Sequence, residues 1–496
     1  MPQAQSKRVA IVGGGLAGLA AAVGLAGGGI GGRQTAGKTV EVEIFEARRR
    51  LGGRAASFAD AASGESVDYC QHISMGCCTN LGDFCQRTGT ADLFRRDGVL
   101  RLFTRDGRAS ALRGTRGLPA PLHLAPALLQ LHFLSLRERI GIGRAMLRLA
   151  RAAPADLAAR TVADWLSEQG QSPRAIERFW GAVLVSALGE SVERASMLHA
   201  QKVFVDAYLS NASGYELHVP LVSLSELYDV RLTEWLARAG VRLLLGTPVE
   251  QIDVEQANVG QNCVEERGAD TNGVTLTSSA GTHHYDAVII ATPWQRVRHI
   301  LSPQLVAVLP QVSALDQIDA APITGVHLWF DRVITELEHA ALVDMLSQWL
   351  FRRTDLAEGR ATNEYYYQVV ISASRNLTGR DRADVVAEIC DELRSVWPAA
   401  RDAKLLRWKM VTDPVAVFSV RPGIERVRPP QSTALGQLFL AGDWTDTGWP
   451  ATMEGAIRSG YLAAEGVLRH FGHEARLLAA DLPRSWLARL LLGNPT

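Results

Sequence analysis

The start of the chain carries the feature that most constrains its fold, a predicted strand followed directly by a glycine turn. Residues 7–12, KRVAIV, are rich in β-branched side chains, and GGGLAGLAAAVGLA follows at once. Gly13, Gly15 and Gly18 form G-x-G-x-x-G, in which the glycines allow a tight turn, close approach to a pyrophosphate and close helix packing. The order predicts a βαβ unit that binds a dinucleotide. A glycine turn without a ligand is the alternative that this motif alone leaves open.

A second predicted strand ends in an acidic residue, which makes the motif more specific. TVEVEIFE, residues 39–46, alternates apolar and polar side chains and ends at Glu46, where a carboxylate can accept hydrogen bonds from both ribose hydroxyls. Glu46 lies further along than the usual distance of about 20 residues. The cause is GGGIGGRQTAGK, residues 27–38, which we interpret as an inserted surface loop and not as a second phosphate site.

The composition is that of an ordinary globular protein with room for two or more domains. The chain has 496 residues, of which 47% are hydrophobic and 21% charged. Lys plus Arg and Asp plus Glu both number 52, so no overall field favours nucleic acid. The six cysteines are too few for a disulfide scaffold, and the leader MPQAQSK has no apolar signal region. We therefore expect a cytoplasmic, reduced protein that does not bind nucleic acid.

The stretch VDYCQHISMGCCTN, residues 67–80, gathers side chains that could bind metal or perform chemistry. Cys70, Cys77, Cys78 and Cys85 read C-x6-C-C-x6-C. Zinc sites need matched pairs of ligands two to four residues apart, and this spacing does not supply them. We therefore predict no metal site here.

A second glycine motif follows Glu46 and indicates which dinucleotide is bound. In ARRRLGGRAAS, Gly52, Gly53 and Arg54 can bring backbone and a guanidinium to the same diphosphate. Here the chain resembles the flavoprotein superfamily of amine oxidases and phytoene desaturases, whose motif runs G-x-G-x-x-G, acidic residue, G-G-R. The resemblance implies bound FAD. It also implies an α/β fold, in which a Rossmann-type FAD-binding domain carries an inserted α+β substrate domain.

Two later segments fit the same superfamily. HYDAVIIATPWQ resembles the internal strand that closes over the nucleotide, and LFLAGDWTDTGWPATMEGAIRSGYLAAEGVL reads as strand, turn and helix. By resemblance, Asp443 in that turn binds the ribityl–phosphate region, and the helix N-terminus beside Met453 points at the flavin C2 carbonyl. Its dipole would stabilise negative charge on reduced flavin. Gln71 would contact the flavin pyrimidine edge, and the backbone at Val249 would contact adenine.

The resemblance thus implies a full set of cofactor contacts and a division of the chain. The implied FAD-binding residues are Gly13, Gly15, Leu16, Ala17, Gly18, Glu46, Ala47, Arg48, Gly53, Arg54, Gln71, Val249, Gly442, Asp443 and Met453. The FAD-binding domain would comprise residues 1–75, 220–300 and 405–470, the substrate domain residues 76–219 and 301–404, and an amphipathic tail residues 471–496. The polar residues 256–272 predict an exposed hairpin loop.

Several stretches narrow the resemblance to one enzyme family. VDYCQHISMGCCTNLGDF, HLWFDRVIT, SQWLFRR and LAGDWTDTGWPATMEGAIRSG are similar to hydroxysqualene dehydroxylases of squalene and hopanoid biosynthesis. The resemblance implies reductive removal of the hydroxyl of hydroxysqualene, a C30 isoprenoid. His72 would then supply a proton, and Asp68 would orient it or stabilise positive charge on the allylic carbon. The alternative is that Asp68 caps a turn, His72 is a satisfied buried imidazole, and the pair Cys77–Cys78 only packs.

Two apolar segments predict contact with a membrane surface. The 20 uncharged residues 117–136 contain Pro119, Pro121 and Pro126, which would break a spanning helix. They read either as a buried element or as a patch lying in the membrane interface. In the tail PRSWLARLLLG, helical spacing places Trp486, Leu487, Leu490 and Leu491 on one face. We expect peripheral contact with the inner face of the cytoplasmic membrane, although packing against the body explains both segments equally well.

Other functions fit the same scaffold. An oxidative isoprenoid desaturase or an amine oxidase would use the same FAD site, and a lipid-binding protein without catalytic flavin would share the fold. The complete set of flavin motifs disfavours the lipid-binding protein. Apolar runs at residues 118–136 and 341–351 favour a hydrophobic substrate over a small amine. Other enzymes of the squalene pathway are the possible protein partners.

Overall fold

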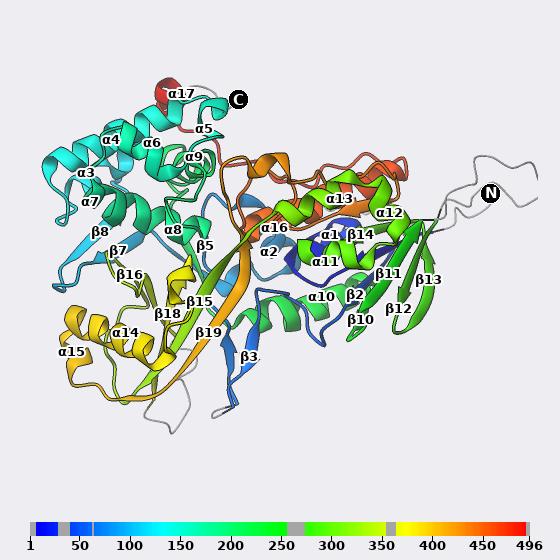
Figure 1. Ribbon diagram of the computed structural model, residues 1–496, viewed down its shortest axis with the longest axis horizontal. Coiled ribbons are helices and arrows are strands. Elements are labelled where there is room, and N and C mark those ends of the chain that lie inside the picture. Colours follow the sequence, from blue (N-terminus) through cyan, green and yellow to red (C-terminus); the bar gives the residue numbers. More distant parts are fainter. Residues whose placement is uncertain (1–5, 28–39, 62–63, 255–272, 354–363, 493–496) are drawn as a thin grey trace, which may run out of the picture.

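The computed structural model describes residues 6–27, 40–61, 64–254, 273–353 and 364–492 (Figure 1). The predicted surface insert, residues 27–38, lies outside the described residues apart from Gly27. The predicted hairpin loop at residues 256–272 lies outside them entirely.

A five-stranded parallel sheet forms the centre of the nucleotide-binding part. Its order is β10–β2–β1–β14–β20, with β1 Lys7–Val12, β2 Val40–Glu46, β10 Arg242–Leu245, β14 Ala287–Ile290 and β20 Leu438–Leu440. β1, β10, β14 and β20 are mostly apolar because both faces of a parallel sheet are covered, whereas β2 alternates apolar and acidic side chains. The predicted Rossmann-type α/β fold is confirmed, including the strand at residues 7–12.

Two helices from opposite ends of the chain pack together on this sheet. They are α1 (Leu16–Gly27) and α16 (Met453–His470), which lie side by side in Figure 1. The contact is close because α16 presents a glycine, Gly460, whose added Cβ would lie 2.1 Å from the Ala17 carbonyl oxygen. α16 begins where the Thr452 side chain accepts a hydrogen bond from Gly455 N, an N-cap.

A second, seven-stranded sheet dominates the substrate side. Its order is β19–β15–β18–β17–β16–β7–β8, with β7 Val99–Phe103, β8 Ala109–Arg113, β15 Ala320–Phe330, β16 His339–Leu342, β17 Trp349–Arg352, β18 Tyr365–Ser372 and β19 Leu405–Phe418. β19 lies within the segment 405–470 that we had predicted for the FAD-binding domain, yet it pairs with β15. The long strands β15 and β19 run from this sheet towards the nucleotide-binding part (Figure 1).

Small sheets and helices complete the described chain. An antiparallel sheet of β11 Val249–Val254, β12 Val274–Ser278 and β13 Gly281–Tyr285 flanks the nucleotide-binding part, whereas β3 Ser57–Ala59 pairs with β4 Ser66–Asp68, and β5 Ser74–Met75 and β6 Phe94–Asp97 flank β9 Leu217–Pro220. The remaining α-helices are α2 Thr79–Thr88, α3 Ala125–Leu129, α4 Leu136–Arg151, α5 Pro154–Leu157, α6 Val162–Glu168, α7 Pro173–Ala175, α8 Ala182–Leu188, α9 Met197–Val203, α10 Arg231–Ala239, α11 Trp294–Ile300, α12 Pro303–Val308, α13 Pro310–Ala314, α14 Arg382–Val396, α15 Pro398–Arg401 and α17 Trp486–Leu492.

Short helical turns of two other kinds join these elements. Those of 3-10 type are η1 Ala91–Leu93, η2 Leu122–Leu124, η6 Leu315–Gln317, η7 Ser374–Leu377 and η8 Ile424–Arg426. Three are π-helical, namely η3 Ile176–Gly181, η4 Phe204–Leu209 and η5 Glu226–Val230. Because π-helical turns are rare and often mark functional sites, η3 and η4 draw attention to the helices beside the substrate sheet.

The two apolar segments of the sequence meet in the structure. Ser485, just before α17, donates from its backbone N to Ser210 O at 2.9 Å and from its hydroxyl to Ala120 O at 2.5 Å. Trp486 and Leu490 of the predicted apolar face are 67% and 74% exposed, whereas Ala488 and Leu492 pack inward. In the described ranges, no helix has the length and apolarity needed to cross a membrane.

Candidate functional site

The first glycine motif forms a turn that tolerates no side chains at two of its positions. Gly13 has φ of 115°, and a Cβ there would lie 2.6 Å from Ala291 O. A Cβ on Gly18 would lie 2.0 Å from the carbonyl oxygen of Gly13, so the helix can start here only if this position is glycine. These two glycines therefore shape the turn and the packing of α1 on the sheet.

Gly15 has a different role, because the space around it is open. Apart from its two chain neighbours, Gly53 Cα at 3.9 Å would be the only atom of the described residues within 4 Å of an added Cβ. Gly52 N donates to Gly14 O at 2.9 Å, so the G-G-R loop lies directly against the G-x-G turn. Leu16 and Ala17 form the first turn of α1 beside this space. The two loops therefore make an open cradle of backbone that fits a diphosphate.

Glu46 lies at the C-terminal end of β2, beside that cradle. Its carboxylate accepts hydrogen bonds from Gly14 N at 2.7 Å and from Arg48 N at 2.8 Å, which fixes its direction. Thr247 N donates to Glu46 O at 2.9 Å, and Val249 begins β11 two residues later. The structure thus brings together Glu46, its neighbours Ala47 and Arg48, and Val249.

Arg54 and Asp443 come from opposite ends of the chain and form an ion pair. Arg54 Nη2 lies 2.6 Å from Asp443 Oδ1, and its Nη1 donates to Ala416 O at 2.7 Å. The adjacent turn is fixed because Gly442 N donates to the Ser459 hydroxyl at 2.8 Å. Both predicted phosphate-region residues therefore lie together at the edge of the cradle.

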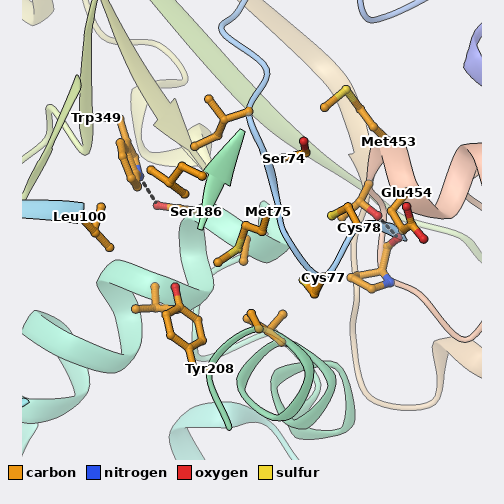
Figure 2. A pocket seen from close by; sticks show the side chains of 18 of the residues that line it. Ser74, Met75, Cys77, Cys78, Leu100, Ser186, Tyr208, Trp349, Met453 and Glu454 are labelled. Atoms are coloured by element: carbon orange, nitrogen blue, oxygen red, sulfur yellow. Dashed lines mark hydrogen bonds between the residues drawn. The ribbon is translucent and has the colours of Figure 1, made fainter. Parts of the chain in front are cut away.

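A cavity lies between the N-terminus of α16 and the seven-stranded sheet (Figure 2). Met453, Cys78 and Glu454 lie at one side of the view and Trp349 and Leu100 at the other. The lining is mostly apolar and comprises Gln71, Ile73, Ser74, Met75, Cys77, Cys78, Leu100, Leu102, Ala182, Val183, Ser186, Ala187, Lys202, Val203, Asp206, Ala207, Tyr208, Leu217, Ala341, Trp349, Phe351, Val370, Trp449, Pro450, Thr452, Met453 and Glu454.

Gln71 is the polar group of this lining that most needs a ligand. Its side chain is 7% exposed, and neither its amide nitrogen nor its amide oxygen has a hydrogen-bond partner among the described residues. Leaving such a group unpaired costs about 1–3 kcal/mol. A ligand edge that carries both a donor and an acceptor would satisfy it, and the pyrimidine edge of a flavin is such an edge. The observation supports the predicted contact.

Glu454, which the sequence analysis did not single out, lines the cavity and connects two helices beside it. It is fully buried, and its carboxylate accepts from Leu81 N at 2.8 Å, Asn80 N at 3.1 Å and Arg458 Nε at 2.7 Å. The side chain therefore joins the start of α2 to the start of α16. The spacing of Glu454 and Arg458, four residues apart on a helix, was the signal that could have indicated this role.

Asp68 forms a saturated buried ion pair. Its Oδ2 lies 2.6 Å from Arg353 Nη1, and its Oδ1 accepts from the Ser57 hydroxyl at 2.6 Å and from Leu224 N at 2.8 Å. In the described part of the chain, no hydrogen bond joins Asp68 to His72. The predicted orientation of His72 by Asp68 is therefore not seen here, and the carboxylate instead connects β4 to Leu224, just before η5, and to Arg353.

His72 is half-buried and makes its ring hydrogen bond to backbone. Its Nδ1 lies 2.8 Å from Cys70 O, and a carbonyl can only accept, so Nδ1 carries the proton. Burial lowers the pKa of His72 below its ordinary value, and the charge of Arg54 acts in the same direction. The ring is therefore neutral at pH 7, with Nε2 free to accept. The ring is not part of the described cavity lining.

The cysteines of this region are free thiols with little nucleophilic character. Burial raises the pKa of Cys70 to about 12 and that of Cys85 to about 11. A hydrogen bond with Cys78, together with burial, raises the pKa of Cys77 well above its ordinary value. These groups stay protonated at neutral pH. Within the described ranges, no cluster of His, Cys, Asp and Glu could hold a metal ion.

Comparison with known proteins identifies the family. Residues 16–468 match the family of flavin containing amine oxidoreductases. The chain belongs to this family. It is a flavin-dependent oxidoreductase, and FAD is its cofactor. The open cradle at Gly15 and the unpaired amide of Gln71 fit that group.

Proteins with similar sequences include phytoene and zeta-carotene desaturases. The 15-cis-phytoene desaturase of Synechococcus elongatus is 25% identical over an alignment that covers 93% of this chain and 96% of that protein. The zeta-carotene desaturase of Synechocystis is 24% identical over an alignment that covers 96% of this chain and 99% of that protein. Among solved structures, cyclohexylamine oxidase from Brevibacterium oxydans has a TM-score of 0.65 at 18% identity and covers 95% of this chain and 100% of that chain. The structural likeness shows the fold.

We predict that Gly15→Val folds but loses FAD. Among the described residues, only Gly53 Cα would lie within 4 Å of the new Cβ. The valine side chain therefore does not clash with the protein, and the variant should fold. The side chain would instead occupy the approach of the pyrophosphate. Flavin absorbance per mole of purified protein should fall to near zero while the circular dichroism spectrum is retained. Glu46→Ala, which keeps the phosphate contacts, should lower flavin content less. A folded Gly15→Val protein with full flavin would contradict the assignment.

Proposed function

We propose that this flavoenzyme removes the hydroxyl of hydroxysqualene reductively to give squalene. One observation carries the proposal. The two segments most similar to hydroxysqualene dehydroxylases, around Gln71 and around Trp349, line the same cavity although they lie far apart in the sequence. Trp349 and Phe351 stack with ring centroids 5.6 Å apart and make an apolar wall that suits an isoprenoid chain.

The reaction replaces a carbon–oxygen bond with a carbon–hydrogen bond. Bound FAD, in its reduced form, supplies the two electrons as a hydride, and the oxygen leaves with one proton as water. The residues of the protein bind the substrate, exclude water and stabilise charge. Apolar side chains such as Leu100 and Trp349 hold the isoprenoid and exclude water, and the dipole of α16 stabilises negative charge at its N-terminus beside Met453.

Isoprenoid desaturation is the second candidate. The names of the relatives from Synechococcus and Synechocystis favour it, and an apolar cavity suits a carotene precursor equally well. The two reactions run in opposite directions with respect to the flavin. Desaturation takes a hydride from a hydrocarbon, whereas dehydroxylation delivers one to an allylic alcohol.

Anaerobic single-turnover experiments separate the two candidates. We expect photoreduced protein mixed with hydroxysqualene to regain the oxidised flavin spectrum and to yield squalene in the extracted products. Oxidised protein mixed with phytoene should keep its oxidised spectrum. Reduction of the flavin by phytoene, together with no squalene from hydroxysqualene, would replace the proposal by desaturation.

We propose that His72 supplies the proton, by way of a protonated Nε2. Since burial lowers its pKa, the ring must gain a proton before it can give one, and the rate should rise as pH falls below its ordinary pKa of 6.5. His72→Ala should keep its FAD, lose this pH dependence and slow flavin reoxidation by about 10²–10⁴-fold. Stopped-flow traces across the pH range provide the measurement. An unchanged rate in His72→Ala would show that the ring only packs.

We further propose that the end of the molecule around α17 rests on an anionic membrane. Apolar side chains on η2, α3, α4 and α17 and on the turn before η2 are between 39% and 74% exposed, namely Leu118, Leu122, Leu129, Leu136, Ile140, Trp486 and Leu490. Exposed arginines lie on the same helices, at Arg137, Arg144, Arg148 and Arg489. Exposed leucine and tryptophan among arginines suit the interface of a bilayer with anionic lipid. A substrate as apolar as hydroxysqualene resides in such a bilayer.

Point variants test this contact without disturbing the fold. Trp486→Ser and Leu490→Ser should each weaken binding to phosphatidylglycerol-containing vesicles by about tenfold, because each removes one apolar side chain that the bilayer would bury. Val308→Ser, which replaces an exposed apolar residue on α12, is the matched control and should bind normally. Co-sedimentation at low and high salt provides the measurement. Deletion beyond Leu482 is less clean, because it also removes the packed Ala488 and Leu492. If the wild-type protein never co-sediments with these vesicles, the proposed membrane contact is wrong.

A further inference from the structure

An ion pair lines the mostly apolar cavity, and the flavin cradle does not account for it. Lys202 on α9 and Asp206 on the π-helical turn η4 both line the cavity, with Lys202 Nζ 2.5 Å from Asp206 Oδ2. We propose that this pair is the subsite that binds the oxygen of the substrate, with Lys202 as the hydrogen-bond donor. The inference rests on the proposed function, since it assigns a residue that selects an oxygenated isoprenoid.

The pair lies beside Trp449, in the part of the cavity next to the N-terminus of α16. Lys202 Nζ lies 4.8 Å from the centroid of the Trp449 ring, on the loop that leads into α16. Trp449, Thr452 and Met453 line the same cavity. The oxygen-binding group would therefore stand near the N-terminus of α16, where the resemblance expects the reactive ring. Among the cavity-lining residues that the structure describes, Lys202 alone carries a positive charge.

Several other polar groups of the lining are already engaged, whereas the Gln71 amide and the Trp449 indole N–H have no hydrogen-bond partner among the described residues. Glu454 accepts hydrogen bonds from α2 and Arg458, and the Thr452 hydroxyl caps α16. Ser186 accepts from Trp349 Nε1 at 2.8 Å and donates to Ala182 O at 3.1 Å. By contrast, Asp206 Oδ2 is buried and lacks a well-directed hydrogen bond in spite of its closeness to Lys202. An ammonium has three donors, so the pair retains hydrogen-bonding capacity.

Helix stability does not explain why the pair is there. Lys202 precedes Asp206 by four residues, and a helix gains more from the reverse order, with the acid first. The pair is also partly desolvated, because its side chains are only 28% and 27% exposed and face an apolar wall. Because the desolvation of two charges can exceed their mutual attraction, such a pair contributes little to stability by itself.

The charges also indicate what kind of oxygen is bound. Asp206 neutralises Lys202 locally, so the subsite offers a strong donor without a net positive charge. A neutral hydroxyl suits that environment, whereas a diphosphate would need an excess of cations. Tyr208, two residues beyond Asp206, directs its hydroxyl into the cavity (Figure 2). Burial raises the pKa of Tyr208, so this hydroxyl stays protonated and adds a second donor.

A binding experiment tests the assignment without turnover. The oxidised holoenzyme is titrated with hydroxysqualene and with squalene, and the shift of the flavin absorption spectrum gives each Kd. We expect the wild type to bind the alcohol more tightly by about tenfold to 100-fold, the usual gain from a hydrogen bond to a charged group. Lys202→Met should bring the two Kd values together by weakening only the alcohol. Lys404→Met, which replaces an exposed lysine outside the cavity, is the matched control and should keep the wild-type ratio.

The outcomes separate this inference from the proposed function. If Lys202→Met keeps the wild-type preference for the alcohol, the subsite is wrong, whereas squalene formation in the single-turnover experiment would still support the function. If the wild type shows no preference, the subsite is also wrong. Flavin content and thermal midpoint report whether Lys202→Met folds. If it does not, Lys202→Arg, which keeps the donor, should retain the preference and Asp206→Asn should reduce it. A prenyl diphosphate that binds more tightly than the prenyl alcohol of equal length would contradict a neutral oxygen.

Discussion

The close packing of α1 against α16 is the constraint on which the site depends. A Cβ on Gly460 would lie 2.1 Å from Ala17 O, so only glycine allows the two helix axes to approach this closely. The G-x-G turn directly precedes α1, and the turn that contains Asp443 precedes the N-terminus of α16. Because the contact fixes both helices on one sheet, the phosphate cradle and the N-terminus of α16 keep a fixed separation. The ion pair between Arg54 and Asp443 joins the same two ends of the chain.

Local motifs made the nucleotide-binding half predictable from sequence. The strand β1, the glycine turn and Glu46 each depend on neighbours within a few residues, and their roles follow from spacing. The partners of Asp68 were not predictable, because Arg353 lies 285 residues further along the chain. The sheet that β19 joins could not be predicted for the same reason. Its pairing with β15 is a long-range contact, and nothing local in the segment indicates which sheet it joins.

The candidate chemistry was harder to predict than the cofactor, because it depends on orientation. The family resemblance predicts that His72 lies near the flavin, but only the three-dimensional structure shows that its Nδ1 faces the Cys70 carbonyl. Lys202 and Asp206 look like any surface pair four residues apart until α9 and η4 are seen beside a cavity. The tail shows the same limit. Helical spacing found its apolar residues, but which side faces the body depends on the contacts of Ala488 and Leu492.

Saturation of the buried charges distinguishes scaffold from site. Asp68, Glu190 and Glu454 are buried carboxylates that use both oxygens, Glu190 with Arg375 at 2.5 Å and with the Ser419 hydroxyl. Such groups cost little once paired and hold elements together. Gln71 and the pair Lys202–Asp206 differ, because they retain capacity and line the cavity. A pure hydrocarbon would cover these groups without bonding them, which costs free energy. In the proposed subsite, an isoprenoid that carries one hydroxyl would satisfy the pair and leave Gln71 for the flavin, and this is the reason why we propose an alcohol as the substrate.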